Sequence, residues 1–228
     1  MNIIIFYKVA GVFIILVALG FTISQVGITK IFNYPQILRS PIDVILQKFY
    51  DGGVLLKFFW TCFALSSLML IPMSGIFYKI LNREDTPYLI IGTSFGIAAG
   101  IFYVLGLMRW VLLADNLSKK YIDQNTNPRN KEIYEMIFQA FHIYCGNSIG
   151  ETMGFICMGL WISITGISII GSLIIPPFIG IGFIVCGIGI SAGPLEWLGL
   201  KNSNRINKLS MKILMCFLIY LGISLIVY

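Results

Sequence analysis

Six apolar segments dominate this sequence, and each is long enough to cross a lipid bilayer as a helix. A spanning helix needs about 20 predominantly apolar residues. The segments that qualify are residues 4–27, 54–79, 88–113, 143–170, 175–196 and 209–227. Only 11% of the residues are charged and 57% are hydrophobic, so one water-soluble core cannot bury the apolar surface. The expected fold is all-α: a polytopic membrane protein with a six-helix transmembrane bundle and a single domain over residues 1–228.

The first apolar segment is expected to stay in the protein as a helix. It begins almost at Met1 and is interrupted only by Lys8. A cleaved signal peptide has a basic start, a shorter apolar core and a small-residue cleavage site, and the last of these is not clear here.

Two connecting segments have helical patterns of their own. Ser40-Pro41-Ile42-Asp43 predicts a helix start with Ser40 as the cap, and Gly52-Gly53 predicts its end. Between them the apolar residues share one face, which predicts an interfacial amphipathic helix in the first loop. A helix packed over the end of the bundle fits the same periodicity.

The second pattern covers residues 131–140, which we expect to form an amphipathic helix that runs directly into the fourth span. The fourth and fifth spans are separated by a short break that contains Pro176-Pro177. Because proline stops helix propagation, a tight hairpin is expected there.

Basic residues fall mostly on one side of the predicted topology. Loops one, three and five hold twelve of them, against Lys8, Lys79 and Arg83 on the other side. Since basic loops stay in the cytoplasm, these three loops are expected on the cytoplasmic side of the membrane, with both termini outside. The net charge of +6 then lies beside anionic lipid headgroups rather than nucleic acid.

Glycines repeat every four residues on two consecutive spans. Rows of small residues allow helix backbones to approach closely in lipid. The two rows therefore predict helix packing at these positions, inside the monomer or in a homo-oligomer. The rows are Gly92, Gly96 and Gly100 on the third span, and Gly146, Gly150 and Gly154 on the fourth.

Two charged side chains fall inside the third and fourth spans, near the same membrane face. At 1.5 Å per residue, Arg109 lies about 6 Å and Glu151 about 12 Å inside the bilayer. Charges at such depth usually face the protein interior and carry a function or a partner. An Arg109–Glu151 pair is therefore expected, because the flexible arginine stem can bridge the offset.

Further polar and aromatic residues accompany this pair. Tyr144, Asn147, Ser148 and Glu151 lie at i, i+3, i+4 and i+7, which makes a stripe on an α-helix. His142, the only histidine, lies one turn earlier. The candidate ligand or ion site consists of Arg109, Trp110, His142, Tyr144, Asn147, Ser148 and Glu151.

This constellation fits several functions. Glu151 could move an ion or proton, Arg109 could bind the carboxylate or phosphate of a small or lipid-like ligand, or the pair could only lock helix packing. An intramembrane enzyme acting on lipid is less favoured, since no nucleophile–base pair is visible. His142, Cys145 and Glu151 match a metal site poorly, and the five cysteines lack paired loop spacing. No cofactor, metal or disulfide is expected.

Three motifs carry a family resemblance. They are Tyr34-Pro35-x-Ile37-Leu38-Arg39, Gly106-Leu107-x-Arg109-Trp110 and His142-x-Tyr144-x-Gly146-x-x-x-Gly150-Glu151-x-x-Gly154. With these motifs the chain resembles, over roughly residues 5–200, the uncharacterised bacterial membrane family catalogued as domain of unknown function 4386. The resemblance implies a compact multi-helix membrane protein in which Arg109, His142 and Glu151 match motif positions, and it implies no activity.

The sequence departs from the family pattern at two positions. The family often has histidine where this chain has Thr152, and an acid where it has Asn33. These departures weaken any mechanism that needs a second histidine or an extra acid.

Overall fold

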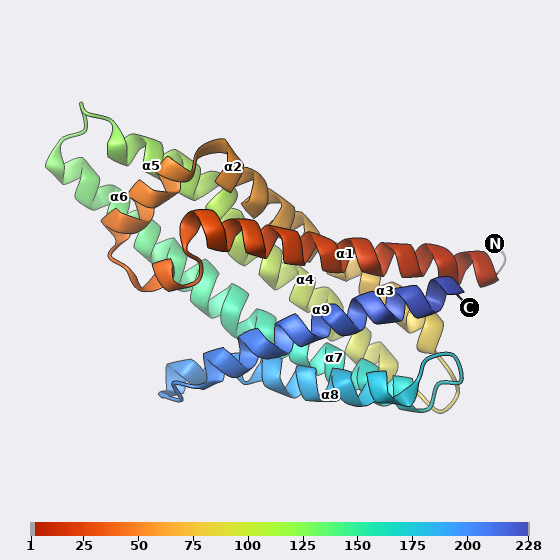
Figure 1. The fold of residues 1–228 in the computed structure, drawn as a ribbon. Helices are drawn as coiled ribbons and strands as arrows, with labels where there is room; N and C mark the ends of the chain where they lie inside the picture. Colours follow the sequence, from red (N-terminus) through yellow and green to blue (C-terminus); the bar gives the residue numbers. More distant parts are fainter. Residues whose placement is uncertain (1–2, 228) are drawn as a thin grey trace.

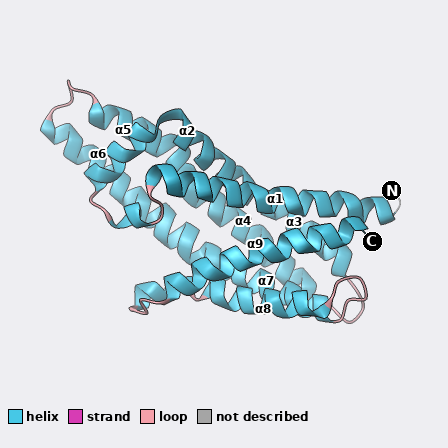
Figure 2. Cartoon of the chain, in the orientation of Figure 1, coloured by secondary structure: helices cyan, strands magenta, loops and turns pink. Residues whose placement is uncertain are grey.

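The computed structural model describes residues 3–227, and these are almost entirely helical (Figures 1 and 2). Met1, Asn2 and Tyr228 lie outside the described residues. The elements, with η for 3₁₀ or π segments, are α1 Ile3–Phe32, η1 Gln36–Arg39, α2 Ile42–Leu68, α3 Leu70–Leu81, α4 Leu89–Met108, η2 Arg109–Ala114, α5 Asp115–Ile122, α6 Pro128–Phe141, η3 His142–Met153, α7 Gly154–Ile170, α8 Pro177–Ser191, η4 Gly193–Leu198 and α9 Ser203–Val227.

These elements join into helical stretches that confirm the predicted polytopic membrane fold. Within residues 3–227, six stretches are long and apolar enough to cross a membrane. They are 3–32, 42–81, 89–122, 128–170, 177–198 and 203–227. Each contains nearly all of one predicted span, and most extend beyond the apolar residues into amphipathic turns. The two ends of the chain lie side by side at one end of the bundle (Figure 1).

The amphipathic helix of the first loop is present, and its apolar face packs against the protein. Ile45, Leu46 and Phe49 are buried in the core. Residue Gly53, with φ 55° and ψ −149°, breaks the helical geometry inside α2, so the predicted end of this helix is a kink. The prediction of Ser40 as the cap was wrong, because α2 begins at Ile42 without a side-chain cap hydrogen bond.

The other two connections agree with the sequence. The Asn127 side chain caps α6 by accepting a 2.8 Å hydrogen bond from the backbone N–H of Asn130. From there the helix continues through η3 and α7 to Ile170. A short turn then leads into α8 at Pro177, which confirms the expected hairpin.

The buried side chains form two clusters at different levels of the bundle. One cluster joins α1, α3, α4, α7, α8 and α9. The second joins the end of α1 to η1, α2, η2, α5 and α6, and its buried aromatic side chains are Phe32, Phe49, Trp60, Trp110 and Phe138. This second cluster lies at the end opposite to the termini (Figure 1) and supports the candidate site.

Glycines lie where α4 meets the fourth span. The closest backbone approach joins Gly106 to Gly150, since a Cβ added at Gly106 would lie 2.9 Å from the Gly150 Cα. Added Cβ atoms elsewhere in the two rows would meet side chains: Ile164 at Gly92, Trp161 at Gly96, Ile71 at Gly100, Arg109 at Gly146 and Tyr103 at Gly154. Gly106, outside both predicted rows, thus makes the tightest backbone contact between these helices.

Replacement of Gly106 by alanine is expected to destabilise the protein. The new methyl group would also lie 3.1 Å from the Cys145 carbonyl oxygen, so backbone atoms must move. Overpacking of this kind costs about 1–3 kcal/mol. Thermal unfolding of the purified protein in detergent measures the effect. Gly75→Ala is the matched control, because nothing lies within 4 Å of a Cβ there. Equal stability of the two variants would contradict the close contact.

Candidate functional site

The candidate polar residues lie on two π-helical segments, η2 and η3. Segments of π-helix are rare and occur frequently at functional sites. Side-chain hydrogen bonds follow the wider turn: Ser148 Oγ donates to the Ile143 carbonyl at 3.2 Å, and Thr152 Oγ1 donates to the Asn147 carbonyl at 2.8 Å. Each bond joins residues five positions apart, as a π-helix requires.

The wider turn changes which residues share a face. His142, Gly146 and Gly150 are buried at intervals of four. Tyr144 is 67% exposed and Ser148 is also exposed, so the structure does not bring these two toward Arg109. Asn147 and Glu151 are half-buried. The stripe expected from α-helical spacing is therefore divided between the interior and the outer surface.

Arg109 lies at the centre of the site and is only 8% exposed. Its guanidinium rests against Gly146, where an added Cβ would lie 2.5 Å from the Arg109 Cζ. The Nη1 group donates a hydrogen bond to the Gly106 carbonyl. The Nε group is buried and has no hydrogen-bond partner among residues 3–227. A glycine on the facing helix thus makes room for a guanidinium whose hydrogen-bond donors are only partly used.

Aromatic rings enclose Arg109 on one side. The Arg109 Cζ lies 5.1 Å from the centroid of the Trp110 ring, a favourable cation–π position. Trp110 stacks on Trp60, with centroids 4.8 Å apart and planes inclined by 13°. Phe49 stacks on Trp110 as well, at 5.9 Å. These buried rings exclude water from this side of the guanidinium.

His142 belongs to the same group of rings. Its imidazole stacks on Phe138 at 5.7 Å and meets Trp110 edge-on at 6.0 Å. The ring is buried, and its Nδ1 atom has no hydrogen-bond partner in the described part of the chain. The structure therefore brings Arg109, Trp110 and His142 together.

Glu151 faces Arg109 without touching it. Among the described residues the ion pairs are Arg39–Glu196, Lys57–Asp115, Lys119–Asp115 and Arg83–Asp85, so the expected Arg109–Glu151 pair is not a contact pair. Arg109 is nevertheless the strongest electrostatic partner of Glu151, followed by Glu196, Lys208 and Arg39. The carboxylate thus lies between a buried cation and a charged group at the surface.

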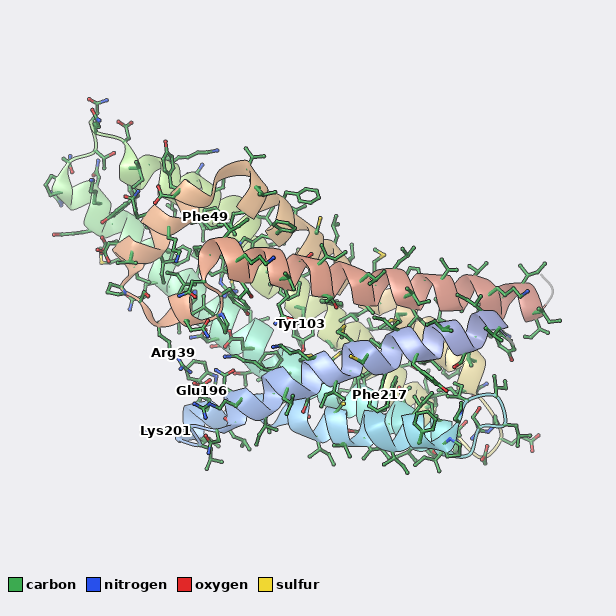
Figure 3. All side chains as sticks on the ribbon, viewed as in Figure 1. Arg39, Phe49, Tyr103, Glu196, Lys201 and Phe217 are labelled. Carbon is green, nitrogen blue, oxygen red and sulfur yellow. The ribbon has the colours of Figure 1, made fainter. Side chains whose placement is uncertain are left out.

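Tyr34 and Tyr103 also interact electrostatically with Glu151, and Tyr34 was missed as a site residue by the sequence analysis. Burial raises the pKa of the Tyr34 phenol, the Glu151 charge raises it further and the Arg109 charge opposes this. The Tyr103 hydroxyl is buried without a hydrogen-bond partner in residues 3–227. Figure 3 shows Arg39 beside Glu196 near the surface, with Tyr103 nearer the middle of the bundle. Tyr34 and Arg39 carried a signal, because both belong to the first motif.

The described residues contain no group of three or more His, Cys, Asp or Glu side chains placed to hold a metal ion.

Six membrane-length helices that bury an arginine, an imidazole and tryptophan rings define a polytopic integral membrane protein with a polar intramembrane site. The family model described as "Domain of unknown function (DUF4386)" matches residues 9–228, and the chain belongs to this family. The match confirms the resemblance and extends it to the C-terminal helix. The comparisons with curated proteins and with solved structures gave no match.

The geometry predicts that Glu151→Gln changes the free energy of unfolding by less than about 1.5 kcal/mol, since no hydrogen bond to the carboxylate is lost. Arg109→Leu/Glu151→Leu should not recover stability, because Arg109 also loses its contacts with Gly146 and Trp110. Thermal unfolding in detergent measures both, with Glu132→Gln on the exposed face of α6 as the control.

The opposite pattern would identify a structural ion pair. Breaking a buried contact pair costs about 3–5 kcal/mol. A loss of that size in Glu151→Gln, with recovery in the double variant, would contradict the separation of the two side chains.

Proposed function

We propose that this protein binds the anionic group of a small or lipid-like ligand at Arg109, between η2 and η3. The observation that supports this function is the buried guanidinium, which has a free Nε group and no carboxylate in contact within the described residues. A buried charge is costly unless it is paired and hydrogen-bonded. Arginine matches carboxylate and phosphate groups with two parallel hydrogen bonds. A bound anion would satisfy both requirements.

The neighbouring side chains limit which anions fit. The Tyr103 hydroxyl and His142 Nδ1 supply further polar groups that have no hydrogen-bond partner among the described residues. Glu151 repels a second negative charge and favours a ligand that also carries an ammonium or hydroxyl group on its side. Arg109 is then the anion contact, Glu151 the ligand-contacting acid, and His142 a gate near the interface.

The charged group around Glu151 supports a route of entry. Lys208 and the Arg39–Glu196 ion pair interact electrostatically with Glu151 and lie in or beside loops one and five. A polar ligand can pass along these side chains to the carboxylate and then to Arg109. The same arrangement would serve an ion or proton moving by way of Glu151.

One observation favours a second function, that of a structural or regulatory membrane module. The Arg109 Nη1 group already donates to the Gly106 carbonyl, and the guanidinium fills the space over Gly146. In this role the arginine fixes the register of the two helices and needs no ligand. This role predicts that anionic lipid probes do not stabilise the protein through Arg109, and the thermal shifts described next distinguish it from ligand binding.

Ligand binding predicts thermal stabilisation by lipids with an anionic headgroup. Suitable probes are lysophosphatidylethanolamine, which adds an ammonium group, and lysophosphatidic acid, which does not. A probe at 100 times its Kd stabilises by about 2.7 kcal/mol, which for a chain of this size raises the Tm by roughly 5–10 °C. Arg109→Gln should reduce both shifts, and Glu151→Gln should abolish the preference for the ammonium-containing probe.

Arg129→Gln, exposed in the first turn of α6, is the matched control and should keep both shifts. Arg109→Lys keeps the charge and loses the two-pronged contact, so its shifts should be intermediate. Equal shifts in the wild type and Arg109→Gln would contradict binding at Arg109.

We also propose a location, a bacterial plasma membrane with loops one, three and five in the cytoplasm and both termini outside. The basic residues of these loops support this orientation. Alkaline phosphatase fused after the last residue should therefore be active, and the same enzyme inserted within residues 123–127 should be inactive. The reverse result would contradict the orientation.

A further inference from the structure

A pocket of about 380 Å³ with charged groups in its lining lies between α2 and α5, and it shares Phe49 with the rings around Arg109. The kink at Gly53 lies beside it, since the positive φ there interrupts the helix between the loop-one part of α2 and its apolar part. Phe49 and Ser118, both buried, line its inner side. The kink in α2 at Gly53 thus helps to form the pocket.

The charges in this pocket leave one positive charge in excess. Lys57 Nζ lies 2.8 Å and Lys119 Nζ lies 3.0 Å from the same oxygen, Asp115 Oδ2. One carboxylate therefore forms ion pairs with two ammonium groups. Each ammonium group has three donors, so both lysines keep donors for a further acceptor. A phosphate oxygen is the acceptor that two adjacent lysines favour.

The mouth of the pocket is apolar and continuous with a membrane-facing surface. Val54 is 85% exposed, and Tyr50, Leu55 and Phe58 are exposed beside it on α2. Lys57 lies near the start of the apolar part of α2, and Asp115 follows the apolar end of η2. The charges therefore lie at the boundary of the membrane-spanning part, where a lipid headgroup lies above its acyl chains.

We propose that Lys57 and Lys119 bind the phosphate of an anionic phospholipid, whose acyl chains lie along the exposed side chains of α2. Asp115 holds the two ammonium groups in place and weakens binding by its own charge. This lipid site does not rest on ligand binding at Arg109, because Lys57 and Lys119 make the phosphate contacts without it.

Native mass spectrometry of the full chain in detergent tests the proposal. The probes are dioleoylphosphatidylglycerol and the zwitterionic dioleoylphosphatidylcholine. The wild type should prefer the anionic lipid. Lys57→Gln/Lys119→Gln should lose about 20-fold in affinity for it. Asp115→Asn should gain about fivefold, because the lysines stay and the competing negative charge goes.

The control is Lys120→Gln/Lys201→Gln, which removes two exposed lysines outside the pocket and should leave the preference unchanged.

Excess inorganic phosphate distinguishes the source of the anion, and it should not displace the lipid, which has acyl chain contacts as well. An unchanged preference in the double pocket variant, or displacement by inorganic phosphate, would overturn the proposal. If the double variant fails to fold, Asp115→Asn still tests the proposal. An affinity of Asp115→Asn for the anionic lipid that is no higher than that of the wild type would overturn it. Arg109→Gln leaves Lys57 and Lys119 in place and should keep the preference for the anionic lipid.

Discussion

The packing of the Arg109 guanidinium against Gly146 is the interaction on which the rest of the site depends. A cation can enter an apolar bundle only where the facing helix leaves space for it, and glycine provides that space. The backbones of the third and fourth spans come closest one helical turn away, at Gly106 and Gly150. The carbonyl of Gly106 also accepts the hydrogen bond from the guanidinium. One close helix contact therefore fixes both the helix register and the position of the buried charge.

Around this contact the protein separates two environments. On one side, stacked rings from α2 and η2 exclude water from Arg109. On the other side, Glu151 faces charged residues that belong to the surface of the bundle. The guanidinium thus lies between an aromatic core and the charged residues around Glu151. A membrane protein that only needed a stable interior would gain more from apolar residues at these positions.

The sequence predicted the spans well because a run of some 20 apolar residues has few alternatives in lipid. It also located Arg109 and Glu151, since isolated charges are conspicuous in such runs. It could not show that η3 is a π-helix, because hydropathy does not report the turn width, and Tyr144 and Ser148 were placed on the wrong side as a result. Tyr34 and Glu196 were missed because loops bring them to Glu151 from distant parts of the chain. Only three-dimensional packing reveals such neighbours.

Phe49 has a consequence for how the two sites relate. One part of its ring borders the pocket at the α2 kink, and its face lies on Trp110, over which Arg109 rests. An occupant that displaces Phe49 changes the free energy of the whole stack, and with it the position of the guanidinium. Thermodynamic linkage makes such an effect reciprocal. A lipid bound at the α2 kink would then change the affinity of the Arg109 site for its ligand. A ligand at Arg109 would change the affinity for that lipid by the same factor.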